Sequence, residues 1–85
     1  NDDDVRKALE LLAYRYSMAG QREATRLLFG RLIEMDSQSP KAFDYKYQIV
    51  QSYLNVGQEK KYLAEIKEWV SEFGPESQWY QAHKG

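Results

Sequence analysis

Apolar side chains recur with a helical period along most of this chain. Between Val5 and Ala19 they fall at i, i+3, i+4, i+7 and i+11, at Val5, Ala8, Leu9, Leu12 and Tyr16. This spacing puts them on one stripe of a helix. A second helix is predicted over Arg22–Met35, with an apolar face of Ala24, Leu27, Leu28, Leu32 and Met35, widened by Phe29 and Ile33.

Two more helices are predicted over Pro40–Val56 and Gln58–Phe73. Ser39 is the expected N-cap of the first, and Pro40 its first helical residue. The expected inward residues are Ala42, Tyr45, Ile49, Tyr53 and Val56 in the first helix, and Tyr62, Leu63, Ile66, Trp69, Val70 and Phe73 in the second. Loops of a few residues predict that neighbouring helices are antiparallel. Since every predicted element is a helix, the expected fold class is all-α.

The chain ends in a short predicted helix over Gln78–Lys84. Gly74 and Pro75 stop the preceding helix, Ser77 supplies a cap, and Trp79 is the expected anchor onto that helix.

An internal repeat organises the chain. A shift of 37 residues places Leu12 on Ile49, Tyr16 on Tyr53 and Gly20 on Gly57. Each Tyr falls on the last turn of a first helix, where its ring is expected to pack against the second helix. Each Gly falls just past that helix, where positive φ is often needed and glycine adopts it readily.

This pattern resembles the tetratricopeptide repeat family, whose motif is W-x2-L-G-x2-Y, A-x3-F and P. The matching positions of the first unit are Leu9, Leu12, Ala13, Tyr16, Thr25, Phe29 and Pro40. Those of the second are Lys46, Ile49, Val50, Tyr53, Tyr62, Ile66 and Pro75. The Trp of the motif is replaced in both units. The 37-residue period exceeds the family's 34, with the extra residues in Asp36–Ser39.

The resemblance implies one domain over residues 1–85, built as an antiparallel helix-turn-helix solenoid. Repeat 1 covers residues 5–36 and repeat 2 covers 40–74. Residues 77–84 start a third repeat or form a capping helix. A plain four-helix bundle fits much of the same pattern, but the repeat offset favours the solenoid. Two units are few for stable stacking, and we therefore expect a fragment of a longer protein or a self-associating domain.

Charge and composition weigh against several classes of function. The 12 basic and 13 acidic side chains give a net charge of −1, without the basic excess typical of nucleic-acid-binding surfaces. The chain has no cysteine, and therefore no disulfide or thiolate chemistry. No apolar run approaches the length of a membrane span.

No catalytic or metal-binding set is recognisable in the sequence. His83 is the single histidine and is expected at the surface without a catalytic partner. Asp2, Asp3 and Asp4 are adjacent, whereas calcium loops space their ligands at alternate positions. Asp3 or Asp4 is instead expected to cap the first helix. We expect no enzyme, cofactor or metal site.

Binding is the remaining class of function. In tetratricopeptide repeats the first helix of each unit lines a concave groove that holds an extended peptide or a partner helix. The resemblance implies groove positions at Lys7, Glu10, Tyr14, Ser17 and Met18, and at Asp44, Tyr47, Gln51, Leu54 and Asn55. Tyr14 and Tyr47 lie off the apolar stripe, so they are either contact residues for a partner or packed between neighbouring helices. The Lys, Asn and Arg set that clamps a C-terminal carboxylate in some members is missing.

The expected function is a non-catalytic scaffold for a protein or peptide partner. The alternatives are a structural spacer or self-association module, a helical accessory domain of an enzyme, and a nucleic-acid-binding helical repeat. Two stretches of the chain are similar to repeats of bacterial cell-envelope tetratricopeptide proteins. The first is Ser39–Ala42 with Tyr47 and Ser52–Tyr53, and the second is Phe73–Trp79. This second resemblance implies a bacterial envelope location.

Overall fold

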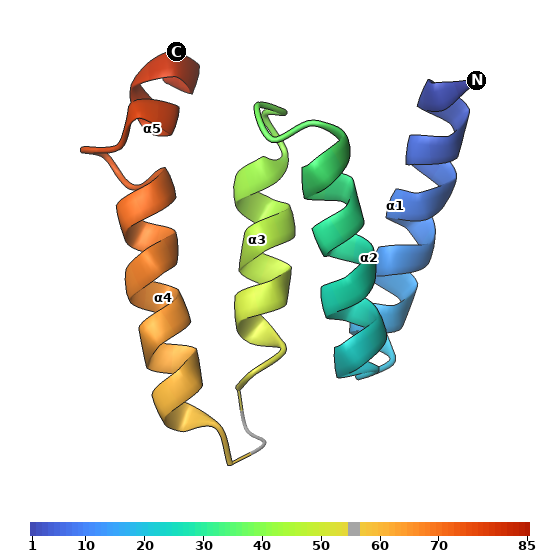
Figure 1. Ribbon diagram of the computed structural model, residues 1–85, viewed down its shortest axis with the longest axis horizontal. Helices are drawn as coiled ribbons and strands as arrows, with labels where there is room; N and C mark the ends of the chain where they lie inside the picture. The colour runs from blue at the N-terminus through green and yellow to red at the C-terminus, as the bar shows by residue number, and fades with distance from the viewer. Residues whose placement is uncertain (55–56) are drawn as a thin grey trace.

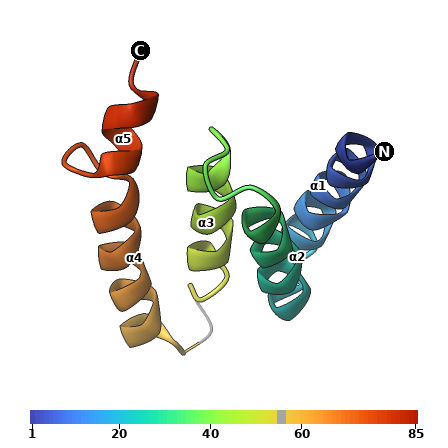
Figure 2. The same cartoon turned by 45° about the horizontal axis from the view of Figure 1, so that its top comes forward.

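The computed structural model describes residues 1–54 and 57–85. These residues form an all-α chain without strands. The helices are α1 (Asp2–Met18), α2 (Arg22–Met35), α3 (Ala42–Gln51), α4 (Glu59–Phe73) and α5 (Gln78–His83). Figures 1 and 2 show α1 to α4 side by side in sequence order, each antiparallel to the next. The all-α prediction is confirmed for the described residues.

The first helix begins earlier than its apolar pattern predicted. Asn1 is the N-cap, and its side chain accepts a hydrogen bond from the Asp4 N–H at 3.0 Å. Asp3 and Asp4 are therefore inside the helix, and their expected capping role was wrong. With Asp2 they place three carboxylates in the first turn, where negative charge stabilises a helix.

The turn between α1 and α2 confirms the expected role of Gly20. Gly20 has φ +74°, and Gly57 has φ +72° at the equivalent place of the second unit. The Gly20 N–H donates to the Ser17 carbonyl at 3.1 Å, and the Gln21 N–H donates to the Tyr16 carbonyl at 3.0 Å. This pair of hydrogen bonds forms a Schellman motif, which ends α1.

The third helix is shorter than predicted at both ends. The Ser39 side chain accepts from the Lys41 N–H at 3.1 Å, and its carbonyl accepts from Ala42 at 3.0 Å, so a turn precedes the helix. After Gln51 the chain makes i→i+3 hydrogen bonds, because the Ser52 hydroxyl donates to the Ile49 carbonyl and tightens the last turn. The predicted end at Val56 lies outside the described residues.

The core sits where α1, α2 and α3 meet. Its fully buried members are Ala13, Phe29, Leu32 and Tyr45. The Phe29 ring lies edge-on to Tyr14 at 4.9 Å and tilted against Tyr45 at 5.7 Å. Aromatic pairs of this geometry add stability beyond the area they bury.

Several residues predicted to face inward are exposed. In the first two helices these are Val5, Ala8, Leu12, Tyr16, Leu27 and Met35, and in α4 they are Leu63 and Val70. The Tyr16 ring is 38% exposed. In α1 the physical reason is the side on which α3 packs: it contacts the flank that carries Tyr14 and Ser17 and leaves the flank with Leu12 exposed.

Helix α5 packs at the C-terminal end of α4. The Ser77 hydroxyl accepts from the Tyr80 N–H at 3.0 Å, which confirms the expected cap. Trp79 lies edge-on to Phe73 of α4 at 5.1 Å, as expected of an anchor, and also contacts Phe43 of α3 at 5.7 Å. In both views α5 lies beyond the end of α4 rather than along its side (Figures 1 and 2).

Candidate functional site

Helices α1 and α3 are joined by a row of polar side-chain contacts, which we name the α1–α3 ladder. Its members on α1 are Glu10, Tyr14 and Ser17, and its members on or just before α3 are Lys41, Asp44, Tyr45 and Gln48. Glu10, Tyr14 and Ser17 recur at helical spacing, so they lie on one flank of α1. Three of the predicted groove residues on α1 therefore fix the position of α3.

Glu10 is the most heavily contacted ladder residue. Lys41 Nζ lies 3.2 and 3.1 Å from its two carboxylate oxygens, and the Tyr45 hydroxyl donates to one of them. Burial alone would raise the pKa of the Glu10 carboxyl. The hydrogen bonds from Tyr45 and Lys41 and the nearby positive charges outweigh burial, so the pKa of Glu10 is lower than usual. Burial, with the carboxylate as hydrogen-bond acceptor, raises the pKa of Tyr45 to about 12.

Tyr14 packs between helices instead of projecting freely. Its hydroxyl donates to the Asp44 carboxylate, and its ring contacts Phe29. Burial, followed by the hydrogen bond to Asp44, raises the pKa of the Tyr14 hydroxyl. Of the two alternatives for Tyr14, the structure shows packing between neighbouring helices.

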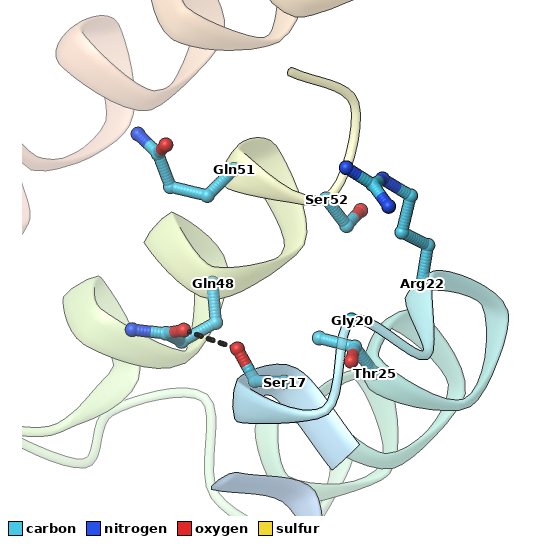
Figure 3. A pocket seen from close by; sticks show the side chains of 7 residues that line it. All are labelled: Ser17, Gly20, Arg22, Thr25, Gln48, Gln51 and Ser52. Atoms are coloured by element: carbon cyan, nitrogen blue, oxygen red, sulfur yellow. Dashed lines mark hydrogen bonds between the residues drawn. The ribbon is translucent and has the colours of Figure 1, made fainter. Parts of the chain in front are cut away.

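A small polar hollow lies at one end of the ladder (Figure 3). The Ser17 hydroxyl and the Gln48 side-chain oxygen are 2.9 Å apart at its edge. Its lining residues are Ser17, Gly20, Arg22, Thr25, Gln48, Gln51 and Ser52, around about 140 Å³. Pockets for small-molecule ligands are usually about 300–1,000 Å³, so this hollow is too small for a typical cofactor.

Two stripes of side chains border the ladder and share Tyr14 and Asp44 with it. On α1 the stripe carries Lys7, Leu11, Tyr14 and Met18, spaced at i, i+4, i+7 and i+11. Met18 is 81% exposed, the largest exposed fraction among the large hydrophobic side chains described. Lys7 is exposed and pairs with Asp3 at 3.7 Å.

The second stripe carries Asp44, Tyr47 and Gln51 of α3 and Leu54 in the turn that follows it. Tyr47 is 36% exposed, and its ring packs against Trp69 of α4 at 5.2 Å. Gln51 and Leu54 are half-buried, and the Leu54 carbonyl accepts from Arg22 at 3.2 Å. Asn55 lies outside the described residues. The Tyr14–Asp44 hydrogen bond holds the two stripes next to each other.

Sequence reasoning missed the α3 half of the ladder. Lys41, Tyr45 and Gln48 were not among the predicted site residues, and neither was Leu11 on α1. A usable signal was present, because Lys41, Asp44, Tyr45 and Gln48 recur at i, i+3, i+4 and i+7. That spacing marks a mostly polar flank of a helix next to its apolar one.

The described residues contain no group of three or more His, Cys, Asp or Glu side chains placed to hold a metal ion. Across residues 1–54 and 57–85, no helix combines the length and the apolar character needed to cross a membrane.

Comparisons of this chain with protein-family models, with curated proteins and with solved structures found no match. The tetratricopeptide resemblance therefore stays a prediction, and the function has to be argued from the chain itself.

Proposed function

We propose that this chain is a non-catalytic protein-interaction module, built as a tetratricopeptide-like solenoid, whose α1–α3 face binds an extended peptide or a partner helix. The observation that carries the proposal is the α1–α3 ladder. Hydrogen bonds between Tyr14 and Asp44 and between Ser17 and Gln48 fix the two stripes as one continuous surface, on which Leu11, Met18 and Tyr47 are exposed.

A fixed surface favours binding because less conformational entropy is lost when a partner docks. The ladder residues are already held by contacts within the chain, so a partner does not have to order them. The exposed contact groups are then Leu11, Met18 and Tyr47. Unbranched methionine and amphipathic tyrosine are well suited to adaptable protein contacts.

The charges of this face define the expected partner. Lys7 is the exposed base of the α1 stripe and Asp44 the acid of the α3 stripe, so neither sign dominates. We expect a segment that presents apolar side chains to Leu11 and Met18, without a strong net charge. A terminal carboxylate or a phosphate is not the expected anchor.

Selection from a displayed peptide library tests the proposal, followed by titration calorimetry with the selected peptides. The variant Leu11→Glu/Met18→Glu places two charges on the face without touching the ladder. We expect it to weaken peptide binding at least about tenfold, since burying an unpaired charge is costly. The matched control is Leu63→Glu, because Leu63 on α4 is as exposed as Leu11, at 57%.

The two variants separate the possible outcomes. Binding lost in Leu11→Glu/Met18→Glu and kept in Leu63→Glu is the expected result. Binding that survives in both variants would move the contact off the α1–α3 face. If no peptide is selected and no partner is captured from cells, the chain would be a structural spacer, and the proposal would fail.

A further inference from the structure

The row of helices ends in two open apolar faces. The first, the α1 end face, consists of Val5, Leu12 and Tyr16 on the flank of α1 away from α3. The second, the α4 end face, consists of Leu63 and Val70, which are 57% and 50% exposed. Figures 1 and 2 show α1 and α4 at opposite ends of the row of four long helices.

Two helix faces of this kind already pack against each other inside the chain, between α2 and α3. Arg26 of α2 lies over the Tyr53 ring at 4.4 Å. Ile33 of α2 and Ile49 of α3 both pack against the core cluster, and Ala42 of α3 is buried. Arg26 and Ile33 are seven residues apart, and Ala42, Ile49 and Tyr53 follow the same helical spacing, so the Arg26–Tyr53 contact brings these two flanks together.

The 37-residue offset relates this internal contact to the two end faces. Each residue of the α1 end face has a counterpart 37 positions later: Val5 in Ala42, Leu12 in Ile49 and Tyr16 in Tyr53. Each residue of the α4 end face has a counterpart 37 positions earlier: Leu63 in Arg26 and Val70 in Ile33. The chain therefore carries both halves of an interface that it already forms once, and each half is open at one end.

We propose that a second copy of this chain docks head to tail, with its α1 end face against the α4 end face of the first copy. The inference uses surfaces separate from the α1–α3 face and does not rest on peptide binding. By the offset, Leu63 lies over the Tyr16 ring of the next copy, and Val70 packs against Leu12.

The chemistry of the end faces favours this pairing. Inside the chain Arg26 approaches Tyr53 and must also donate to Ser52, whereas Leu63 at the equivalent position is apolar and needs no polar partner. Removing apolar side chains from water is favourable in proportion to the area that is buried. Helix α5 lies beyond the end of α4 (Figure 2). Leu63 and Val70 stay 57% and 50% exposed in its presence.

The geometry also fixes the kind of assembly. A head-to-tail contact joins two different faces, so each bound copy still offers one free face of each kind. Growth beyond a dimer is expected. A single helix-on-helix contact is smaller than standard stable interfaces of about 1,600 Å², so the association is weak and depends on concentration.

Sedimentation equilibrium over a range of concentrations tests this assembly, with Leu12→Glu and Val70→Glu as the variants. Leu12→Glu blocks the α1 end face, and Val70→Glu blocks the α4 end face. We expect the average mass of the wild type to rise past the dimer, and each variant alone to stay monomeric. An equimolar mixture of the two variants should form dimers only, since one intact pair of faces remains.

Every other outcome overturns the proposal. A wild type that stays monomeric at all concentrations means that another partner covers these faces. If Val70→Glu alone still dimerises, the α1 end faces pair with each other. Equal association of both variants and the wild type places the contact elsewhere. Circular dichroism checks that each variant is folded, and Leu11→Glu/Met18→Glu is the matched control that keeps self-association while losing any peptide binding.

The absence of cysteine from the sequence allows a direct check of register. Leu12→Cys in one copy and Val70→Cys in another should cross-link when the two are mixed and oxidised. Leu11→Cys with Val70→Cys is the control and should cross-link less. Equal yields from both pairs would contradict the proposed register.

Discussion

The hydroxyl group of Tyr45 donates a hydrogen bond to the carboxylate of Glu10, 35 residues earlier in the chain. Tyr45 is almost fully buried, and its ring packs against Phe29 in the core. One side chain thus ties the apolar core to the polar α1–α3 ladder. The protonation states of both groups are therefore linked to the stability of the fold.

Glu10→Gln should reduce the dependence of stability on acid. The pKa of Glu10 is lowered in the folded chain, so the native state binds this proton less readily than the unfolded state. The stabilisation is present above the ordinary Glu pKa of about 4.3 and is lost as the pH falls through the lower folded value. Urea unfolding from about pH 6 to about pH 3 measures it.

At neutral pH we expect Glu10→Gln to lower the free energy of unfolding by about 1 kcal/mol, mainly through the weaker hydrogen bond from Tyr45. The ion pair with Lys41 contributes less, because the Lys41 side chain is 57% exposed. Lys41→Met is the matched control and should retain most of the acid dependence. If both variants reduced the acid dependence of the free energy of unfolding equally, this would contradict the role given to Tyr45.

Tyr45→Phe should reduce the loss of stability in alkali. The pKa of Tyr45 is raised to about 12, so its stabilisation is complete below the ordinary tyrosine value of about 10 and disappears as the pH rises through 12. The raised pKa of Tyr14 contributes in the same direction, so the single variant removes part of the effect. Unfolding followed by circular dichroism across this range tests the expectation, and an unchanged alkaline profile in Tyr45→Phe would refute it.

The local signals in the sequence predicted the helices and their glycine turns, but not the N-cap of α1 or the ends of α3. The bounds of α2 agree with its apolar period, and positive φ at Gly20 and Gly57 followed from the repeat. Ser77 behaves as the expected cap. Each of these features depends on residues within a few positions of one another, where the physics of capping and periodicity decides the structure.

The sides on which the helices pack were harder to predict. The apolar band of α1 is wider than the part that is buried, and the structure buries Ala13 while exposing Leu12. The choice depends on Thr25, Tyr45 and Gln48, whose hydrogen bonds let polar or mixed side chains face a neighbour. The partners of Tyr45 and Gln48 lie 35 and 31 residues away, and the polar spacing of α3 marks a flank of that helix without identifying its partner on α1.

Gly30→Ala should stabilise the chain. Gly30 lies inside α2, and apart from the backbone of its own helix no atom lies within 4 Å of the place its Cβ would occupy. Alanine in a helix interior is favoured over glycine by about 1 kcal/mol. The matched control is Gly20→Ala, which should be destabilising because Gly20 has φ +74°. Thermal and urea unfolding of the two variants should move in opposite directions.

Phe29→Ala should unfold the chain or come close to it. Phe29 is fully buried between Tyr14 and Tyr45, and removing such a ring costs about 3–5 kcal/mol. Ile66 holds the equivalent position of the second unit but is only half-buried. Ile66→Ala should cost less, about 2 kcal/mol. A larger loss from Ile66→Ala would mean that the second unit carries more of the stability than its burial indicates.

His83→Ala should loosen α5. The His83 ring stacks on Trp79 at 4.1 Å, and its Nε2 lies 3.0 Å from the Gln38 carbonyl in the α2–α3 connection. This contact ties α5 to a segment 45 residues earlier in the chain. Losing a hydrogen bond of about 1 kcal/mol should speed amide exchange in α5 about fivefold.

The Lys84 amide is a suitable probe for this exchange, because it donates to the Tyr80 carbonyl at 2.8 Å. His83→Gln should restore part of the protection, since an amide group can still donate to the Gln38 carbonyl. Tyr80→Ala alters a side chain that is 40% exposed on the same helix and serves as the matched control. Because α5 is short and packs through Trp79 and His83, its protection reports on these two contacts. Unchanged exchange in His83→Ala would leave Trp79 alone as the anchor.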